Sequence, residues 1–376
     1  MKDVDRKHTV AFVASASGGH IIPGTTYAQQ LLNEGRAQNI LFFTANRLFD
    51  RELLALHAPE ASCTQVHVSW FGIPYTRPWL LPYWILVCAR TIIQSLTILK
   101  KHRPTRLVSM GGALSIPVCL AAKLLRIPIE LVELNVEPGR AVGLLAPLAH
   151  RIDICFTQTR SLLRAQPSRV RIMPYPIRFS RAQTNLTPAH ARAQIGLDPH
   201  KKTLLILGGS QGSVQLNQLV VHWLERTPRL ATTVQVIHQT GNDTSVNWQK
   251  FYAKRGIQAL TFSYKDNIAQ HYCAADLIIC RSGAGTLAET EFFGKPAITI
   301  PLEAATTTHQ VRNAWAAASR NPTLFTVLTH SELKRAPGLF GALIHQQLNN
   351  HTFLSTAHQV HLHPSQSNQL QAEHPE

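Results

Sequence analysis

Short apolar runs alternate with longer segments of helical periodicity along most of the chain. The runs are apolar on both faces, which is typical of strands buried in a parallel sheet. They read TVAFV, NILFFTAN, RLVSMGG, PIELVELN and RIDICFTQ in the first half, then TLLILGGS, TVQVIHQTG, ALTFSY, DLIICRSG and AITIPL in the second. The repeated order of strand and helix predicts an α/β fold built on doubly wound sheets.

The strand, turn and helix order that opens the pattern occurs twice. FVASASGGH and LILGGSQGS each place a strand before a Gly/Ser turn, about one domain length apart. The 376 residues are enough for two domains that each bury a core. We therefore expect two Rossmann-like domains, residues 1–178 and 202–355, joined by a linker at 179–201. Residues 356–376 have almost no apolar periodicity, which predicts a disordered tail.

The net charge of +16 is concentrated in the first half, where residues 1–180 hold 21 Lys and Arg against 10 Asp and Glu. A basic half indicates an anionic partner: nucleic acid, a phosphorylated substrate or an acidic membrane surface. No zinc-finger spacing or RNP-like motif favours nucleic acid. The charged N-terminus MKDVDRKHTV and the scattered cysteines, without a C-x-x-C pair, favour a reducing cytoplasmic compartment.

Three glycine-rich turns carry most of the candidate chemistry. They are SGGH at 17–20, GGSQG at 208–212 and RSGAGT at 281–286. Small residues let a ligand approach the backbone, and the first amides of the following helix can bind an anion. None is a full dinucleotide fingerprint or P-loop, and one such turn alone often marks only a tight turn. Three of them together predict a phosphate-bearing ligand.

Two side chains near these turns are candidates for binding and catalysis. Glu289 follows the third turn by about one helical turn, where it either binds ribose hydroxyls or favours the helix N-terminus electrostatically. His20 lies at a strand-to-helix turn and suits a general base. The sequence has no zinc-type histidine spacing, and its one D-x-D lies at residues 3–5, so we expect no metal cofactor. Helix N-termini, together with Arg281 or Arg178, are then left to stabilise a diphosphate.

An aromatic and basic stretch runs from Trp70 to Pro104. Pro82 and Arg90 are expected to break its apolar run before it reaches the length of a transmembrane span. Aromatic residues flanked by Arg and Lys suit a membrane interface. A helix packed on the sheet with a solvated basic end explains the same pattern, and the sequence leaves both interpretations open.

The motifs SGGHIIPG, GGSQGSVQLN, HQTG, CRSGAGTLAE and HQVRNA occur in order over residues 8–320. In order and spacing they resemble the GT-B glycosyltransferases, and among them the MurG family, which adds N-acetylglucosamine to lipid I to give lipid II. The resemblance implies two domains facing an interdomain cleft and an inverting transfer from UDP-N-acetylglucosamine to the 4-hydroxyl of an N-acetylmuramyl residue. It also implies an undecaprenyl-linked acceptor, no metal cofactor and a peripheral position on the cytoplasmic face of the bacterial cell membrane.

The same resemblance implies roles for individual residues. His20 or Glu133 is the base, Glu289 binds the ribose, and Gln310 and Asn313 bind the donor sugar. The donor set comprises Arg178, Ser210, Gln211, Asn217, Lys265, Arg281, Ala284, Gly285, Thr286, Glu289, Gln310 and Asn313. The acceptor set comprises Ser17, Gly18, Gly19, Gly111, Gly112 and Asn135.

Several motifs depart from the family pattern. G-G-T-G-G-H is replaced by SASGGH at 15–20, H-E-Q-N by VELN at 132–135, and G-N-P-V-R by PYPIR at 174–178. The loop before HQVRNA has TTT at 306–308 and lacks the acidic residue expected there. Three alternatives therefore stay open: a transferase that acts on another lipid, such as diacylglycerol or a polyprenol phosphate, a nucleotide-sugar epimerase, and a non-catalytic paralogue that binds a nucleotide sugar.

Overall fold

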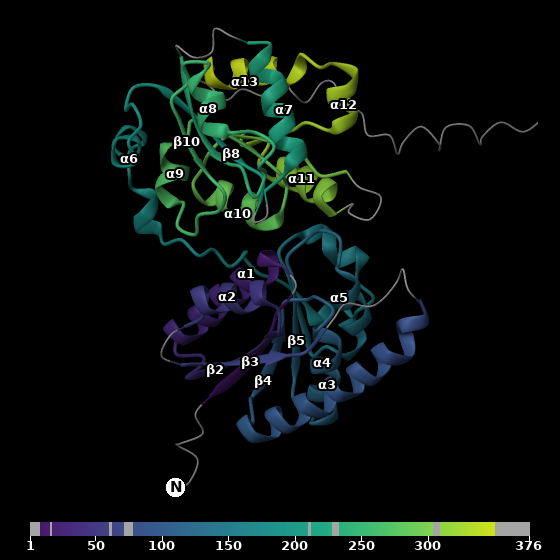
Figure 1. Ribbon diagram of the computed structural model, residues 1–376. Helices are drawn as coiled ribbons and strands as arrows, with labels where there is room; N and C mark the ends of the chain where they lie inside the picture. Colours follow the sequence, from purple (N-terminus) through teal and green to yellow (C-terminus); the bar gives the residue numbers. More distant parts are fainter. Residues whose placement is uncertain are drawn as a thin grey trace, which may run out of the picture.

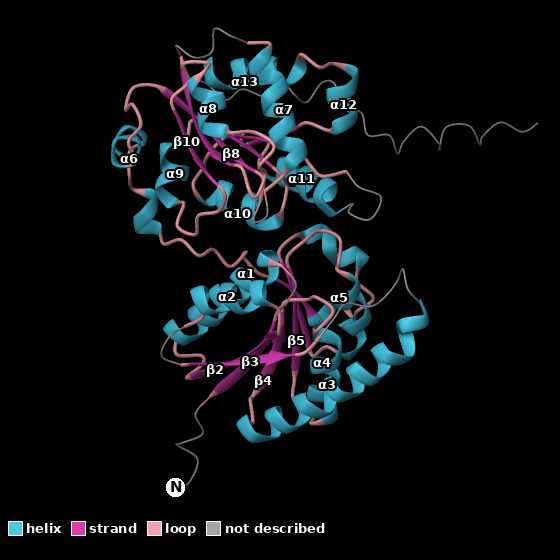
Figure 2. Ribbon diagram, viewed as in Figure 1, coloured by secondary structure: helices cyan, strands magenta, loops and turns pink. Residues whose placement is uncertain are grey.

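The computed structural model describes residues 8–15, 17–59, 62–70, 78–209, 212–227, 233–303 and 309–349. These residues form two parallel sheets, one in each half of the chain, and helices cover both faces of each sheet (Figures 1 and 2). In Figure 1 the first half is the purple and blue lobe and the second half the green and yellow lobe.

The first sheet has seven strands in the order β3-β2-β1-β4-β5-β6-β7. Its side chains alternate between two cores, because successive residues of a strand point to opposite faces. Val10 and Phe12 of β1 enter one core, and Ala11 and Val13 enter the other. The strands are β1 (Thr9–Val13), β2 (Asn39–Ala45), β3 (Cys63–Val68), β4 (Arg106–Ser109), β5 (Ile129–Glu133), β6 (Arg151–Ile154) and β7 (Val170–Ile172). The helices are α1 (Gly18–Asn33), α2 (Leu48–His57), α3 (Leu81–His102), α4 (Ser115–Leu124) and α5 (Arg140–Leu145).

The second sheet repeats this arrangement with six strands in the order β10-β9-β8-β11-β12-β13. The strands are β8 (Lys202–Leu207), β9 (Val234–Gln239), β10 (Ala259–Phe262), β11 (Leu277–Cys280), β12 (Ala297–Thr299) and β13 (Phe325–Val327). The helices are α6 (Pro188–Gln194), α7 (Val214–Glu225), α8 (Trp248–Ala253), α9 (Ala269–Ala274), α10 (Ala284–Phe292), α11 (His309–Arg320), α12 (His330–Arg335) and α13 (Leu339–Asn349).

Both sheets reverse their strand order at one place, between β1 and β4 in the first and between β8 and β11 in the second. Ligands of doubly wound proteins bind in the crevice at such a reversal, beyond the carboxyl ends of the strands. The turns at 17–20 and 111–112 follow β1 and β4, and those at 208–212 and 281–286 follow β8 and β11. Topology therefore places the glycine-rich turns at the two crevices.

The prediction of two doubly wound parallel sheets is confirmed. The pattern did not single out β3, β7 and β13, each of which lies at a sheet edge. Edge strands are not buried on both faces, and β3 and β7 expose several side chains, so they lack a continuous apolar run. The domain boundaries stay predictions, and the predicted tail at 356–376 lies outside the described residues.

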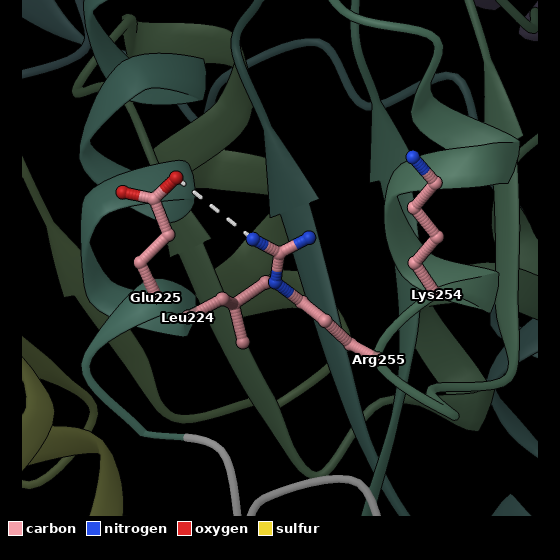
Figure 3. Close-up of a pocket in the computed structure, with 4 residues that line it drawn as sticks. All are labelled: Leu224, Glu225, Lys254 and Arg255. Atoms are coloured by element: carbon pink, nitrogen blue, oxygen red, sulfur yellow. Dashed lines mark ion pairs between the residues drawn. The ribbon is translucent and has the colours of Figure 1, made fainter.

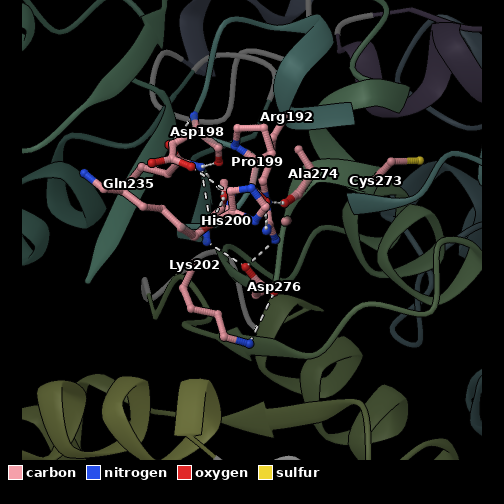
Figure 4. Close-up of polar contacts among 12 residues, drawn as sticks. Arg192, Asp198, Pro199, His200, Lys202, Gln235, Cys273, Ala274 and Asp276 are labelled. Atoms are coloured by element: carbon pink, nitrogen blue, oxygen red, sulfur yellow. Dashed lines mark hydrogen bonds and ion pairs between the residues drawn. The ribbon is translucent and has the colours of Figure 1, made fainter. Parts of the chain in front are cut away.

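The predicted linker is fastened to the second sheet through α6 (Figure 4). Arg192, which is buried, donates from Nε to the Ala274 carbonyl and from a terminal nitrogen to the Pro199 carbonyl. Its other terminal nitrogen pairs with Asp276 Oδ2 at 2.6 Å, and the same oxygen accepts from the Thr203 amide. Phe179, at the start of the linker, is buried in a core cluster of the second sheet. The connection that is left between the two sheets is therefore the short segment 173–178.

The expectation that Pro82 and Arg90 interrupt the aromatic and basic stretch is wrong. Residues 81–102 form one unbroken helix, α3, with Pro82 in its first turn, where a missing amide proton costs no helical hydrogen bond. Among the described residues, α3 is long and apolar enough to cross a bilayer by length and composition. Its Thr91, Ser95 and Leu99 are nevertheless buried against the domain.

A buried histidine in the second lobe makes stability depend on pH. His271 of α9 is fully buried, and its ring lies edge-on to Phe262 at 5.4 Å between centroids. Neither ring nitrogen has a hydrogen-bond partner within the described part of the chain. Burial, assisted by the positive charge of Lys265, lowers the pKa of His271 to about 4. The folded protein therefore holds this ring neutral in mildly acidic solution.

Replacement of His271 by Leu should reduce the acid sensitivity of folding. As the pH falls below about 6.5, His271 binds a proton in the unfolded chain but stays neutral in the folded protein. The contribution of this residue to the free energy of unfolding is therefore fully present above that pH and is lost progressively toward pH 4. The loss due to this group reaches about 3 kcal/mol at about 1.4 kcal/mol per pKa unit. Urea unfolding at pH 7 and pH 4.5 measures it, with the exposed His190→Leu as control. Equal losses in wild type and His271→Leu would contradict the assignment.

Candidate active site

The turn after β1 places His20 in the first turn of α1. Its Nδ1 lies 3.2 Å from the Ser15 carbonyl oxygen and 3.2 Å from Ser17 Oγ. A carbonyl oxygen only accepts, so Nδ1 carries the proton and donates, which leaves a lone pair on Nε2. Burial lowers the pKa of His20; the Ser15 bond opposes this effect, and nearby His309 adds to it. The imidazole is thus a neutral base of defined tautomer.

The turn after β4 closes around this imidazole. Gly111 and Gly112 have φ values of 90° and 84°, a region that favours glycine. A Cβ on Gly112 would lie 3.1 Å from the Ser15 carbonyl oxygen, and one on Gly111 would lie 3.5 Å from His20 Nε2. The structure therefore brings His20 together with Ser17, Gly111 and Gly112 of the predicted acceptor set. Gly18 and Gly19 begin the same helix.

Glu133, the second candidate base, is engaged by its own loop. Oε1 accepts from the Asn135 amide at 2.9 Å and from Asn135 Nδ2 at 3.3 Å, and Oε2 accepts from the Gly139 amide at 2.8 Å. Burial raises the pKa of this carboxyl, and these hydrogen bonds oppose the rise. The carboxylate thus orders residues 134–139, including the predicted acceptor residue Asn135.

The third glycine-rich turn, RSGAGT at 281–286, leads into the N-terminus of α10. Its N-cap, Gly283, has no side-chain acceptor, and no side-chain capping bond forms at this helix end within the described residues, which leaves the amides from Ala284 to Thr286 available. Such amides are suited to an anion. The Tyr175 hydroxyl lies 2.9 Å from the position that a Cβ on Gly285 would occupy. Any larger residue at 285 would displace this tyrosine.

Glu289 projects from α10 into a network of polar side chains. Its Oε1 accepts from Arg178 Nε at 2.9 Å, and its Oε2 accepts from the Tyr272 hydroxyl at 3.0 Å. Arg178 also pairs with Asp266 at 2.9 Å, and Asp266 Oδ1 lies 3.2 Å from His57 Nε2 of the first lobe. Burial raises the pKa of Glu289, and Arg178 lowers it. The arginine and the tyrosine thus hold this half-buried carboxyl in place.

Asn217 of the predicted donor set is buried inside the second lobe. Its Oδ1 lies 3.0 Å from His238 Nε2, and its Nδ2 donates to the Thr240 carbonyl and to Asp243. The side chain is therefore committed to the segment that follows β9.

Arg281 is buried as well and fastens several loops. Its Nε donates to Ser213 Oγ, one terminal nitrogen donates to Gln215, and the other reaches the Ile300 and Pro301 carbonyls and His330. Ser213 and Gln215 follow the GGSQG turn. The guanidinium thus joins the turn after β8 to the segment after β12.

The remaining predicted donor residues have different positions. Gln310 Oε1 accepts from the Leu302 amide at 3.0 Å, and Lys265 is exposed in the loop after β10. Asn313 is fully buried and contacts the first lobe. Ser210 and Gln211 lie outside the described residues.

Sequence reasoning missed three members of the Glu289 network: His57, Asp266 and Tyr272. Asp266 could have been noticed as a carboxylate beyond the carboxyl end of a strand. Tyr272 lies in an apolar helix, and His57 is close to Asp266 only because the two lobes meet. Neither position has a signal in the sequence.

Two further observations delimit the site. No cluster of His, Cys, Asp and Glu suited to a metal ion occurs among the residues that the structure describes. A surface hollow of about 510 Å³ is lined by Leu224, Glu225, Lys254 and Arg255 (Figure 3). It lies at the C-terminal ends of α7 and α8, whereas the crevices lie at the carboxyl ends of the strands. The hollow is thus separate from the candidate site.

Comparisons with known proteins show the family to which this chain belongs. Residues 10–154 match the glycosyltransferase family 28 N-terminal domain, and residues 203–360 match the family 28 C-terminal domain. A protein of Protochlamydia amoebophila named UDP-N-acetylglucosamine--N-acetylmuramyl-(pentapeptide) pyrophosphoryl-undecaprenol N-acetylglucosamine transferase is 33% identical over 306 residues, which are 80% of this chain and 78% of that protein. The chain belongs to glycosyltransferase family 28.

A second sequence relative and a solved structure are also similar to this family 28 chain. A Lawsonia intracellularis protein with that name is 31% identical and covers 82% of this chain, with 81% of its own length aligned. The crystal structure of Acinetobacter baumannii MurG superposes with a TM-score of 0.64 at 22% identity, covering 90% of this chain and 92% of that one. The resemblance to the MurG family, the GT-B fold and the prediction of a glycosyltransferase are confirmed.

Replacement of Tyr272 by Phe should weaken UDP binding by this family 28 enzyme about tenfold, or ~1.4 kcal/mol. Glu289 Oε2 then loses its hydroxyl donor and is no longer held in place for the ribose contact that the family resemblance implies. Titration calorimetry with UDP measures the affinity. Thr290→Val is the matched control, because its buried hydroxyl on the same helix has no partner within the described residues. Unchanged affinity in Tyr272→Phe would show that the tyrosine does not position Glu289.

Proposed function

We propose that this family 28 enzyme transfers N-acetylglucosamine from UDP-N-acetylglucosamine to the 4-hydroxyl of the N-acetylmuramyl residue of lipid I, giving lipid II. The observation that carries the proposal is that two strand-order reversals meet at the lobe junction, one with a neutral histidine and the other with an uncapped helix N-terminus. Helices α1 and α10, which begin at these turns, contact each other there (Figure 1). The names of the relatives supply the donor and the acceptor.

In the proposed reaction His20 is the general base. The acceptor 4-oxygen attacks the anomeric carbon of N-acetylglucosamine, its proton passes to Nε2, and the bond to the UDP oxygen breaks with inversion. The Ser15 carbonyl keeps the proton on Nδ1, so that Nε2 is ready to accept. We favour His20 over Glu133 as the base, because backbone amides of the loop after Glu133 already donate hydrogen bonds to both oxygens of the Glu133 carboxylate.

The donor half of the proposed site divides the work between α10 and Glu289. The first amides of α10 and the positive end of the helix dipole stabilise the diphosphate that leaves. Arg178 and Tyr272 each donate to one oxygen of Glu289, and the carboxylate retains further lone pairs for the two ribose hydroxyls. Asn217 and Arg281 support the site by ordering its loops.

Helix α3 is the part of this enzyme proposed to contact an anionic membrane on the cytoplasmic face. Leu86 and Ile93 are 68% and 65% exposed, and they lie on the helix side away from the buried stripe. The C-terminal end carries Lys100, Lys101 and Arg103, which suit anionic headgroups. Because the stripe of Thr91, Ser95 and Leu99 packs on the domain, we place α3 along the surface rather than across the bilayer.

Transfer of labelled N-acetylglucosamine to lipid I tests the proposed function, with diacylglycerol as alternative acceptor and a no-lipid control. Wild type should label lipid I, and His20→Ala should lower kcat by about 10² to 10⁴-fold at unchanged UDP affinity, because only proton removal is lost. The exposed His190→Ala is the control. Label on diacylglycerol alone would overturn the acceptor, and normal turnover by His20→Ala would overturn the base.

The membrane role of α3 predicts a loss of vesicle binding when its exposed face is charged. Leu86→Glu with Ile93→Glu should reduce cosedimentation with phosphatidylglycerol-containing vesicles at least tenfold, while transfer to lipid I in detergent stays normal. The neighbouring exposed Gln94→Glu adds the same kind of charge without removing an apolar contact. Equal binding by the double variant and wild type would exclude this helix as the membrane contact.

A further inference from the structure

A buried histidine lies behind the turn that follows β8. His238 has no exposed surface and stands one residue before the end of β9. Its Nε2 lies 3.0 Å from Oδ1 of Asn217, near the start of α7, and its Nδ1 lies 3.0 Å from the Tyr252 hydroxyl of α8. The Trp248 ring packs edge-on against the imidazole at 4.7 Å between centroids. The proposed reaction makes no direct use of this histidine.

The neighbours of His238 determine which ring nitrogen carries the proton. Asn217 donates from Nδ2 to the Thr240 carbonyl and to Asp243 Oδ2, each at 2.9 Å. A carbonyl and a carboxylate only accept, so the Asn217 oxygen faces the histidine and accepts from Nε2. Nδ1 then accepts from the Tyr252 hydroxyl. Burial lowers the pKa of His238 to about 3, with Asp243 opposing this effect, so the ring stays neutral and keeps this tautomer.

Hydrogen bonds donated in one direction therefore lead from α8 to the segment after β9. Tyr252 donates to His238, and His238 donates to Asn217. Asn217 in turn donates to the backbone carbonyl of Thr240. All four residues are buried, so a group that loses its partner stays unpaired away from water. These hydrogen bonds thus fix the backbone at residue 240 relative to α7.

The segment fixed in this way packs directly on the turn after β8. Gln239 Nε2 donates to the Gly209 carbonyl at 3.1 Å, and the Gly212 amide donates to the same carbonyl at 2.9 Å. Gly212 has a φ of 76°, and a Cβ there would lie 2.5 Å from Gly241 Cα. Only glycine allows the two backbones to approach so closely. Residues 239–241 therefore set the positions of Gly209 and Gly212, the described ends of this turn.

We infer that His238 is a positioning residue for nucleotide binding, which acts through Asn217 to hold residues 239–241 against the turn after β8. The inference rests on the proposed function, in which the crevice of the second lobe receives UDP. Loss of the Nε2 hydrogen bond displaces this turn and weakens UDP binding. The acceptor half around His20 is unchanged, so KM for the donor rises while kcat at saturating donor is retained.

Two amide replacements of His238 separate positioning from packing. In His238→Gln the side-chain amide reaches the place of Nε2 and still donates to Asn217, whereas in His238→Asn it reaches only the place of Nδ1. Calorimetry should show UDP bound about tenfold more weakly by His238→Asn, which loses one buried hydrogen bond, and within about threefold of wild type by His238→Gln. KM for UDP-N-acetylglucosamine should rise about tenfold in His238→Asn, with kcat for lipid I within about twofold of wild type.

Trp248→Phe is the matched control for packing around the same imidazole. It trims the ring that contacts His238 and removes an indole nitrogen that has no partner within the described residues. Its urea midpoint of unfolding should fall while its UDP affinity stays at the wild-type value. Hydrogen exchange of the Gly212 amide, measured without nucleotide, should speed up in His238→Asn and stay unchanged in Trp248→Phe.

Three results would overturn the inference. Unchanged UDP affinity in His238→Asn would show that the turn does not depend on this histidine. Equal losses of affinity in His238→Gln and His238→Asn, in proportion to their losses of stability, would make it a packing residue alone. Absence of UDP binding by wild type would overturn both the inference and the proposed function. Wild type that binds UDP but labels no lipid I would overturn the proposed function only.

Discussion

The reversal of strand order in each sheet is the constraint on which the rest of the structure depends. Crossover connections between parallel strands are right-handed, so helices that follow strands on the two sides of a reversal lie on opposite faces of the sheet. Accordingly α1 packs into one core through Leu31 and α4 into the other through Val118. In the second lobe, α7 and α10 likewise lie on opposite faces of the sheet: Val220 of α7 is buried in one core and Leu287 of α10 in the other. The diverging helix ends leave the crevices in which the candidate residues lie.

The two crevices contain carboxylates that are held in contrasting ways. Glu133 accepts from nitrogens of Asn135 and Gly139 in the loop that follows it, and these hydrogen bonds order that loop. Glu289 is held by a cation and a phenol, each on a different oxygen, and stays oriented from two sides. Both carboxyls have a pKa raised by burial. Their surroundings, rather than residue type, separate a structural carboxylate from one suited to a ligand.

The sequence predicts the parts of this fold that are repetitive and buried on both faces. The central strands and the glycine turns follow from local pattern, and topology then brings the turns together. Side-chain partners do not follow from pattern: Asn217, Arg281 and Asn313 stand in motif positions, yet each is committed to protein groups. The unbroken length of helix α3 was missed for another reason, since a proline in a first turn and one in a helix interior look alike in sequence. Contacts between the lobes depend on tertiary structure alone.

The anchoring of α6 has a mechanical consequence. With Arg192 bound to Asp276 and to two carbonyls, and Phe179 buried in the core of the second lobe, the covalent tether between the sheets shortens to residues 173–178. These six residues span about 20 Å when fully extended. So short a tether acts as a pivot that permits tilting and twisting of the lobes but little separation. Arg178 is the last residue of this segment, and it also forms an ion pair with Glu289. A change in the angle between the lobes is therefore transmitted through Arg178 to the Glu289 carboxylate.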